Sequence, residues 1–296
     1  MTLFIRRLML PCVLLLSFSA FSAVPQAQDT LSFPALQTYA RLSSDTYADP
    51  GELSDRLMQQ QQRLVHQAVI ADHQVSYFLA QSDGVQTLAV RGTANLSNVL
   101  MDLDIKLQPD DDLGIILHQG FKAGARAVYQ DVQPYLNSEQ PLHITGHSLG
   151  GAIAVVLAMY LQQENTPAAE VVTFGQPKVT NMTGTDQFSD IPLTRVVTSQ
   201  DLVPLVPPIS PMQIKDLDIY WHMGEEIILL GNHEYSRTRG IKSMLRATKA
   251  MNAVPGEDNL HAHKIATYRQ YLDELNEQAE EIPYKTDISL FGLSID

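Results

Sequence analysis

A serine between two glycines is the feature of this 296-residue sequence with the clearest chemical meaning. The run Gly146-His147-Ser148-Leu149-Gly150 follows an apolar stretch at 142–145 and precedes a strongly apolar segment with helical spacing. A serine held on a sharp turn between a strand and a helix tolerates no bulky neighbours, and glycine removes the side chains that would clash. The pattern therefore predicts that Ser148 is a nucleophile exposed above a sheet.

Two backbone N–H groups are candidates for stabilising negative charge near such a serine. The N–H of Leu149 would point at the oxyanion formed on an attacked carbonyl, at a helix N-terminus that adds partial positive charge. Thr93, just after a predicted strand and beside Gly92, could donate its N–H and its hydroxyl. The alternatives are an anion-binding turn at the helix and an ordinary strand-end turn at Thr93.

A serine nucleophile needs a base and an acid, and in this kind of turn-based site the acid and then the histidine follow the serine along the chain. Asp201 comes directly after the predicted strand 193–198, where it could orient a histidine and stabilise its charged form. Four histidines come later. His222 and His233 look structural, and spacing leaves both His261 and His263 open as the base.

Strand and helix patterns alternate through the centre of the chain. Strands are predicted at 75–80, 85–90, 113–117, 142–145, 170–174 and 193–198, with a β-like run at 219–230, and helices at 33–47, 122–135 and from 261 to about 280. Asp83-Gly84 between the first two strands is a strong hairpin signal. The segment 53–65 is either a helix or the approach to a strand. The alternation predicts an α/β fold with a mostly parallel central sheet and helices on both faces.

The N-terminal segment and the composition limit the possible cellular location and binding partners of the protein. Residues 1–27 are predicted to be an export signal, with Arg6 and Arg7 ahead of an apolar run, and a retained anchor is the alternative. Residues 28–296 are expected to form a single domain without cysteine, since Cys12 is the only one. A net charge of −13 is unfavourable for nucleic-acid binding. Serine-based ester hydrolysis needs no metal and no organic cofactor, and no protein partner can be inferred.

Two further segments are amphipathic. Residues 94–104 carry apolar residues at helical spacing, which fits either a moving lid or a surface helix packed on the core. Residues 237–249 are locally basic, and a solvated surface helix is favoured there over contact with anionic lipid.

Six motifs occur in an order that resembles the class 3 lipases, the fungal-lipase-like α/β hydrolases. They are Arg91-Gly92-Thr93, His118-x-Gly120-Phe121, Gly146-His147-Ser148-Leu149-Gly150-Gly151, Thr173-Phe174-Gly175-Gln176-Pro177, Asp201-x-Val203-Pro204 and His263 followed by Tyr268. The resemblance covers about residues 35 to 275 and implies the α/β-hydrolase fold. One departure stands out: the family often continues its fourth motif with Arg-Val-Gly-Asn, where this chain has Lys178-Val179-Thr180-Asn181.

Carried over by this resemblance, Ser148 is the nucleophile, Asp201 the acid and His263 the base. His263 is preferred to His261 because members of the family often have a tyrosine five residues after the histidine, and Tyr268 fits. The resemblance also implies Thr93 and Leu149 as oxyanion donors and a lid at 94–104.

The function expected from this resemblance is ester hydrolysis on lipids. We expect a secreted or periplasmic, envelope-located triacylglycerol lipase that acts on a lipid ester at an oil–water or membrane interface through an acyl-enzyme. A phospholipase A1 or a short-chain carboxylesterase could use the same residues, and an inactive lipid-binding module is a further alternative.

Overall fold

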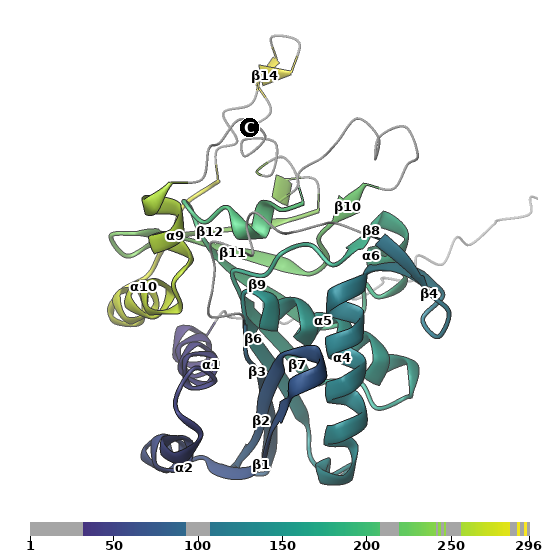
Figure 1. Cartoon of the computed structure of the whole chain (residues 1–296). Coiled ribbons are helices and arrows are strands. Elements are labelled where there is room, and N and C mark those ends of the chain that lie inside the picture. Colours follow the sequence, from purple (N-terminus) through teal and green to yellow (C-terminus); the bar gives the residue numbers. More distant parts are fainter. Residues whose placement is uncertain are drawn as a thin grey trace, which may run out of the picture. The chain divides into compact units, whose positions relative to one another are not determined.

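A nine-stranded sheet forms the centre of the chain (Figure 1). The computed structural model describes residues 32–92, 107–207, 219–240, 242–243, 246, 256–284, 289–290 and 293–294. From Ser32 onward these residues belong to one compact unit. The strands, in their order across the sheet, are β1 (Arg63–Ile70), β2 (Val75–Ser82), β3 (Val85–Val90), β6 (Leu142–His147), β7 (Glu170–Phe174), β9 (Leu193–Thr198), β11 (Glu225–Gly231), β12 (Glu234–Arg239) and β13 (Glu280–Glu281).

The middle of this sheet is parallel. Strands β3, β6, β7, β9 and β11 all run in the same direction, while β2 is antiparallel to both β1 and β3, and β12 is antiparallel to β11. The carboxyl ends of parallel strands meet at one edge, so the loops after Val90, His147, Phe174 and Thr198 lie along that edge. The predicted mostly parallel sheet is confirmed.

The hairpin of β2 and β3 shows why its turn could be read from the sequence. Asp83 and Gly84 have φ values of 49° and 78°, and Ser82 pairs with Val85. A two-residue turn with both φ values positive matches the right-handed twist of the strands, and Asp-Gly adopts it readily. This expectation is confirmed.

Helices cover both faces of the sheet, as predicted (Figure 1). On one face α1 (Phe33–Asp45) packs against α10 (Ile265–Glu277), with α2 (Pro50–Gln59) and α9 (Glu257–His263) beside them. On the other face α4 (Gln119–Val132) packs against α5 (Leu149–Gln163), which lies on β6 and β7. The expected C-terminal helix is divided in two at Lys264, so that His263 is the last residue of α9.

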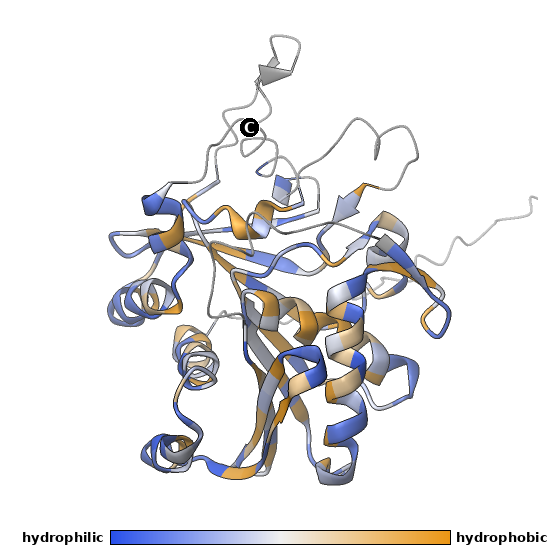
Figure 2. Ribbon diagram, in the orientation of Figure 1, coloured by the Kyte–Doolittle hydropathy of each residue, from blue (hydrophilic) through white to orange (hydrophobic). Residues whose placement is uncertain are grey.

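Helix α5 is apolar on all sides because it is enclosed on all sides. Its residues from Gly150 to Leu161 are all buried, between the sheet and α4. A helix that is hydrophobic all round is typical of a core position. Figure 2 shows apolar residues gathered in the strands of the central sheet and in α5, while the outer faces of α2 and α10 are hydrophilic. The turn that carries Ser148 is therefore attached to a helix that is buried on all sides.

A second, four-stranded antiparallel sheet lies on the edge of the described fold, with strand order β10-β8-β5-β4. Its members are β4 (Leu107–Asp110), β5 (Ile115–His118), β8 (Thr180–Asn181) and β10 (Tyr220–Trp221). The remaining elements are α6 (Met182–Gln187), the short 3₁₀ turns Ala71–His73, Gln133–Tyr135 and Val203–Leu205, and the strands β14 (Ser289–Leu290) and β15 (Leu293–Ser294).

Two sequence-based expectations need correction. The segment 53–65 is not one element, because α2 ends at Gln59 and the edge strand β1 begins at Arg63. The basic segment 237–249 is only partly a surface helix where the structure describes it, since Lys242 is helical and exposed but the start of the segment is a strand. Arg237 and Arg239 belong to β12, and Arg246 is only 3 % exposed. Their carboxylate partners, Glu225 and Glu226, stand on β11, the preceding strand of the same hairpin, and local charge patterning does not reveal this pairing.

Three predicted segments lie outside the described residues, namely the export signal at 1–27, Thr93 and the lid at 94–104. Within the part of the chain that the structure describes, no helix has the length and apolar character needed to cross a bilayer.

Leu157 of α5 tests how much the enclosed helix contributes to stability. Its side chain has no exposed surface and lies in the main core. We expect Leu157→Ala to lower the free energy of unfolding by about 2–5 kcal/mol, through lost burial and a residual cavity. Urea denaturation would measure this loss. The matched control is Val69→Ala, where the side chain is 71 % exposed. It should change stability by less than about 0.5 kcal/mol, and equal losses in the two variants would contradict the packing described here.

Candidate active site

The turn that carries Ser148 is strained and tightly packed. Ser148 joins β6 to α5 with φ 59° and ψ −129°, an unusual conformation for a residue with a side chain. Its N–H donates to the carbonyl of Phe174 at 2.8 Å. A Cβ atom on Gly146 would lie 2.5 Å from the backbone of Gly150, and one on Gly150 would lie 2.2 Å from the carbonyl oxygen of Val90. Glycine is required at both positions because backbone fills the space.

Ser148, His263 and Asp201 form one continuous chain of hydrogen bonds. Ser148 Oγ lies 2.8 Å from His263 Nε2, and His263 Nδ1 lies 2.7 Å from Asp201 Oδ2. All three side chains have no exposed surface, so the expectation that Ser148 is exposed above the sheet is wrong in this structure. A carboxylate only accepts, so Nδ1 carries the proton and Nε2 is free to accept from the serine hydroxyl. This arrangement can withdraw a proton from Ser148.

Asp201 is held by three donors, of which His263 is one. The N–H of Val203 donates to Oδ1 at 2.8 Å, and the hydroxyl of Tyr268 donates to Oδ2 at 2.5 Å. Burial and the negative charge of Asp201 raise the pKa of Tyr268 well above its ordinary value, so the phenol keeps its proton. The tyrosine five residues after His263 thus contacts the acid, a role that spacing alone did not reveal.

Gly175 makes room for Asp201 and His263. It follows β7 with φ 59°, and a Cβ atom there would lie 2.8 Å from His263 Cε1 and 2.9 Å from Asp201 Oδ2. The motif around Gly175 was recognised in the sequence without a role. A glycine directly after a predicted strand is a usable signal for such a close approach.

His147 and Tyr47 are two further residues of the site that sequence reasoning missed. His147 Nε2 lies 2.7 Å from the carbonyl oxygen of His263, and His147 Nδ1 lies 2.9 Å from the hydroxyl of Tyr47. Because a carbonyl only accepts, Nε2–H donates to His263 and Nδ1 accepts from the tyrosine. Tyr47 in turn accepts from the N–H of Gly92, next to the predicted donor Thr93. These hydrogen bonds fix the position of the His263 backbone.

His147 is uncharged, and this matters because its ring centroid lies 4.7 Å from that of His263. Burial and the neighbouring His263 ring lower the pKa of His147 to about 3. A second positive charge beside a protonated His263 would oppose its formation. A neutral His147 supports His263 without that penalty.

The remaining predicted residues fall in different places. Leu149 is the first residue of α5, so its N–H has no acceptor within the helix and is available to a ligand. His261 is exposed, while His222 and His233 bond to the backbone carbonyls of Pro204 and Glu274. Of the four candidate histidines, His263 is the one bonded to Ser148.

No group of three or more His, Cys, Asp or Glu side chains suited to a metal ion occurs among the described residues.

The neutral state of His147 predicts a pH-dependent loss of stability. The unfolded histidine titrates near 6.5 and the folded one near 3, so the unfolded chain binds a proton first as the pH falls. The contribution is complete above pH 6.5 and is lost between pH 6.5 and about 3, by about 1.4 kcal/mol per pH unit. His147→Gln removes the titrating group. Urea denaturation at pH 7, 5.5 and 4 should show a steeper decline for the wild type, and parallel declines would contradict a neutral His147.

Comparison with known proteins agrees with this geometry. The family described as Lipase (class 3) matches residues 87–210. Lipase ZK262.3 of Caenorhabditis elegans is 33 % identical over 144 residues, which is 44 % of this chain and 40 % of that protein. Secreted mono- and diacylglycerol lipase 1 of Fusarium solani is 30 % identical over 135 residues, 41 % of this chain and 39 % of that protein. The chain thus spans about two fifths of the length of these relatives.

The fold has known counterparts as well. The structure of lipase II from Rhizopus niveus superposes with a TM-score of 0.59 at 24 % identity, over 67 % of this chain and 80 % of that chain. That likeness establishes the α/β-hydrolase fold. The resemblance to the class 3 lipases seen in the sequence is confirmed over residues 87–210, a region that contains Ser148 and Asp201.

Proposed function

We propose that this protein is a serine hydrolase that cleaves the carboxylic esters of lipids, with triacylglycerols as its substrates. The observation that carries the proposal is the hydrogen-bonded chain from Ser148 through His263 to Asp201, at a strained strand-to-helix turn. Relatives named as lipases support the substrate class.

In the first half of the reaction the serine becomes acylated. His263 Nε2 takes the proton from Ser148 Oγ as the oxygen attacks the ester carbonyl. Asp201 stabilises the imidazolium that forms and holds its Nδ1–H in place. The imidazolium then gives its proton to the departing alcohol oxygen, which leaves the acyl group on Ser148.

In the second half, water replaces the alcohol. His263 accepts a proton from water as it attacks the acyl-enzyme, and the fatty acid departs as Ser148 regains its proton. Both tetrahedral intermediates place a negative oxygen near the N–H of Leu149, where the first turn of α5 adds positive potential. Thr93, the second expected donor, stays a prediction.

We also propose that the protein acts outside the cytoplasm. The export pattern at 1–27 and the name of the secreted Fusarium solani relative support this placement.

Ser148→Ala is the first test of the proposal. It removes the nucleophile, so we expect kcat on a soluble ester to fall by about 10⁴-fold or more while the melting temperature changes little. A serine-reactive phosphonate should label the wild type and spare the variant. Full activity in Ser148→Ala would refute the assignment.

Asp201→Asn tests the acid separately. An asparagine at 201 would favour the wrong tautomer of His263, so kcat should fall by about 10⁴-fold. Asp190→Asn, on an exposed aspartate, is the matched control and should keep the wild-type rate. Comparable losses in both variants would show that the effect is not specific to Asp201.

Substrate class is decided by a panel of esters. We expect hydrolysis of emulsified long-chain triacylglycerol, and a relative named as a mono- and diacylglycerol lipase supports acylglycerols as the substrate class. Release of fatty acid from triacylglycerol, phosphatidylcholine vesicles and a soluble butyrate ester would be titrated in parallel, with Ser148→Ala as the blank. Cleavage of phosphatidylcholine alone would make the protein a phospholipase A1, and cleavage of the butyrate alone a short-chain esterase.

A further inference from the structure

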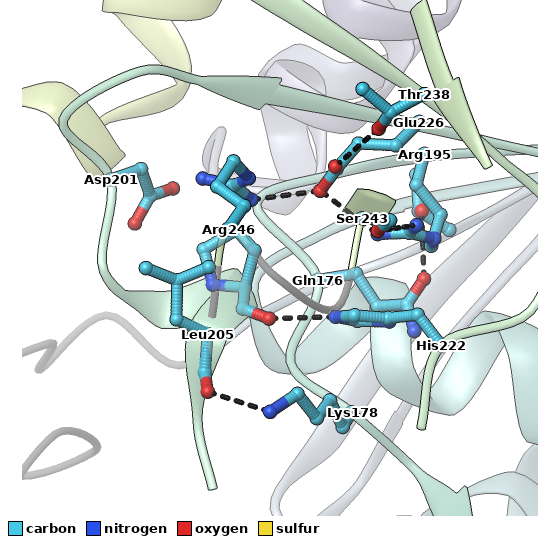
Figure 3. A network of polar contacts seen from close by, with 12 residues as sticks. Gln176, Lys178, Arg195, Asp201, Leu205, His222, Glu226, Thr238, Ser243 and Arg246 are labelled. Atoms are coloured by element: carbon cyan, nitrogen blue, oxygen red, sulfur yellow. Dashed lines mark hydrogen bonds and ion pairs between the residues drawn. The ribbon is translucent and has the colours of Figure 1, made fainter. Parts of the chain in front are cut away.

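Lys178 donates hydrogen bonds to the loop that carries Asp201. The Lys178 ammonium nitrogen donates to the carbonyls of Leu205 and Pro207, each at 2.9 Å, and the Lys178 backbone N–H donates to the carbonyl of Val206 at 3.0 Å. Figure 3 shows the Lys178 side chain directed at the Leu205 carbonyl. One residue thus binds three consecutive carbonyls of this loop.

His222 binds the carbonyl that comes just before these three. Its Nε2 lies 2.6 Å from the carbonyl oxygen of Pro204. Burial, and then the charges of Arg195 and Lys178, lowers the pKa of His222 well below its ordinary value, so the ring is neutral. Since a carbonyl only accepts, Nε2 carries the proton. The carbonyls of Pro204, Leu205 and Pro207 therefore depend on two basic side chains, and that of Val206 on the Lys178 backbone N–H.

The surroundings leave Lys178 able to donate over the neutral pH range. Lys178 is 1 % exposed. Burial and the positive charges of Arg246 and Arg195 lower its pKa to about 7, and the negative charge of Glu226 opposes them. The charged amine has three N–H groups and the neutral amine has two, so either form serves both carbonyls.

The loop transmits this support to the carboxylate. Asp201 Oδ1 accepts from the N–H of Val203 within the same loop, so a shift of the loop moves the carboxylate. Asp201 Oδ2 must stay 2.7 Å from His263 Nδ1 to orient the ring. The Lys178 segment also includes Gly175, which lies against both Asp201 and His263.

We propose that Lys178 and His222 are positioning residues, which hold the 201–207 loop so that Asp201 meets His263. The proposal rests on the hydrolase function proposed above. Without these side chains, the carbonyls of Pro204, Leu205 and Pro207 lose donors, which is costly in an apolar interior and drives the loop to rearrange. Their effect on the reaction is expected to pass through Asp201.

Lys178→Met tests this by removing the amine and keeping most of the side chain. On a soluble butyrate ester we expect kcat to fall by about 10- to 100-fold, since a misplaced catalytic group costs rate, with KM changed less than about twofold. The acid limb of the kcat/KM profile should also move to lower pH, because an imidazolium without a well-placed carboxylate is harder to form. If Lys178 only stabilised the fold, the folded Lys178→Met protein would not lose kcat at constant KM, and the acid limb of its kcat/KM profile would not shift.

The matched control is Lys122→Met. Lys122 also donates from its amine to a backbone carbonyl, that of Pro109 at 2.9 Å, and pairs with Asp110. It lies on α4, on the other face of the sheet from α9. This variant is expected to keep the wild-type kcat and pH profile, even where its melting temperature falls. A folded Lys178→Met protein with wild-type kcat and pH profile would overturn the proposal.

His222 provides a second pair in case Lys178→Met does not fold. His222→Gln keeps an N–H donor, whereas His222→Leu has none. We expect kcat of His222→Leu to fall at least about tenfold below that of His222→Gln. Equal kcat values and equal pH profiles in the two variants would contradict positioning by His222.

Labelling by the phosphonate separates failure of this inference from failure of the proposed function. A wild-type protein that is not labelled at Ser148 would refute the hydrolase proposal itself. A wild-type protein that is labelled, together with a Lys178→Met protein that is labelled at the same rate, would refute the positioning role alone.

Discussion

The backbone of Ser148 is the constraint on which the rest of the site depends. Its φ of 59° is a conformation that costs about 1–3 kcal/mol and persists only where the surroundings enforce it. The N–H of Ser148 is bonded to β7, and its carbonyl accepts from the N–H of Gly151 in α5 at 3.0 Å. Because α5 is enclosed on every side, the turn cannot relax without moving the core. Glycine at 146 and 150 follows from the same crowding.

His263 is held at its ring by a charged residue and at its backbone by a neutral one. Asp201 binds its ring, and His147 binds its backbone carbonyl. The carboxylate favours a positive ring, whereas His147 is kept neutral by burial and so adds no repulsion. One support, Asp201, comes from the loop after β9, and the other, His147, is the last residue of β6. Hydrogen-bonded networks of this kind specify one arrangement only when every member has a partner.

Ion pairs around Glu226, near the 201–207 loop, explain how several charges can be buried there. Glu226 accepts from Arg195 at 3.3 Å and from Arg246 at 2.8 Å, and Thr238 binds its other oxygen (Figure 3). Burial by itself raises the pKa of this carboxyl, but the two guanidinium groups lower it to about 2. Buried charges are tolerated when they are paired and hydrogen-bonded in this way. The same positive charges act on Lys178, so the loop support and the ion pairs form one electrostatic unit.

Most of the fold and part of the site could be predicted from local sequence patterns. The hairpin at Asp83-Gly84, the parallel strands and the apolar helix after Ser148 could be predicted, because each depends on residues that are close in sequence. The edge strand β1 was harder, since its residues alternate between partly buried and exposed and no full apolar run marks it. Strand β12 was missed because its basic residues pair with acids on a neighbouring strand.

The sequence alone determined the residue types that could do chemistry, their order along the chain and the turn that presents Ser148. It left His261 and His263 open by spacing, because either could begin the last helix, and only the break at Lys264 and the packing of α9 decided that His263 faces the serine. The supports from His147, Lys178 and His222 were decided by tertiary structure as well. Each joins segments far apart in the chain, and a hydrogen bond between such segments leaves no periodic signal in the sequence.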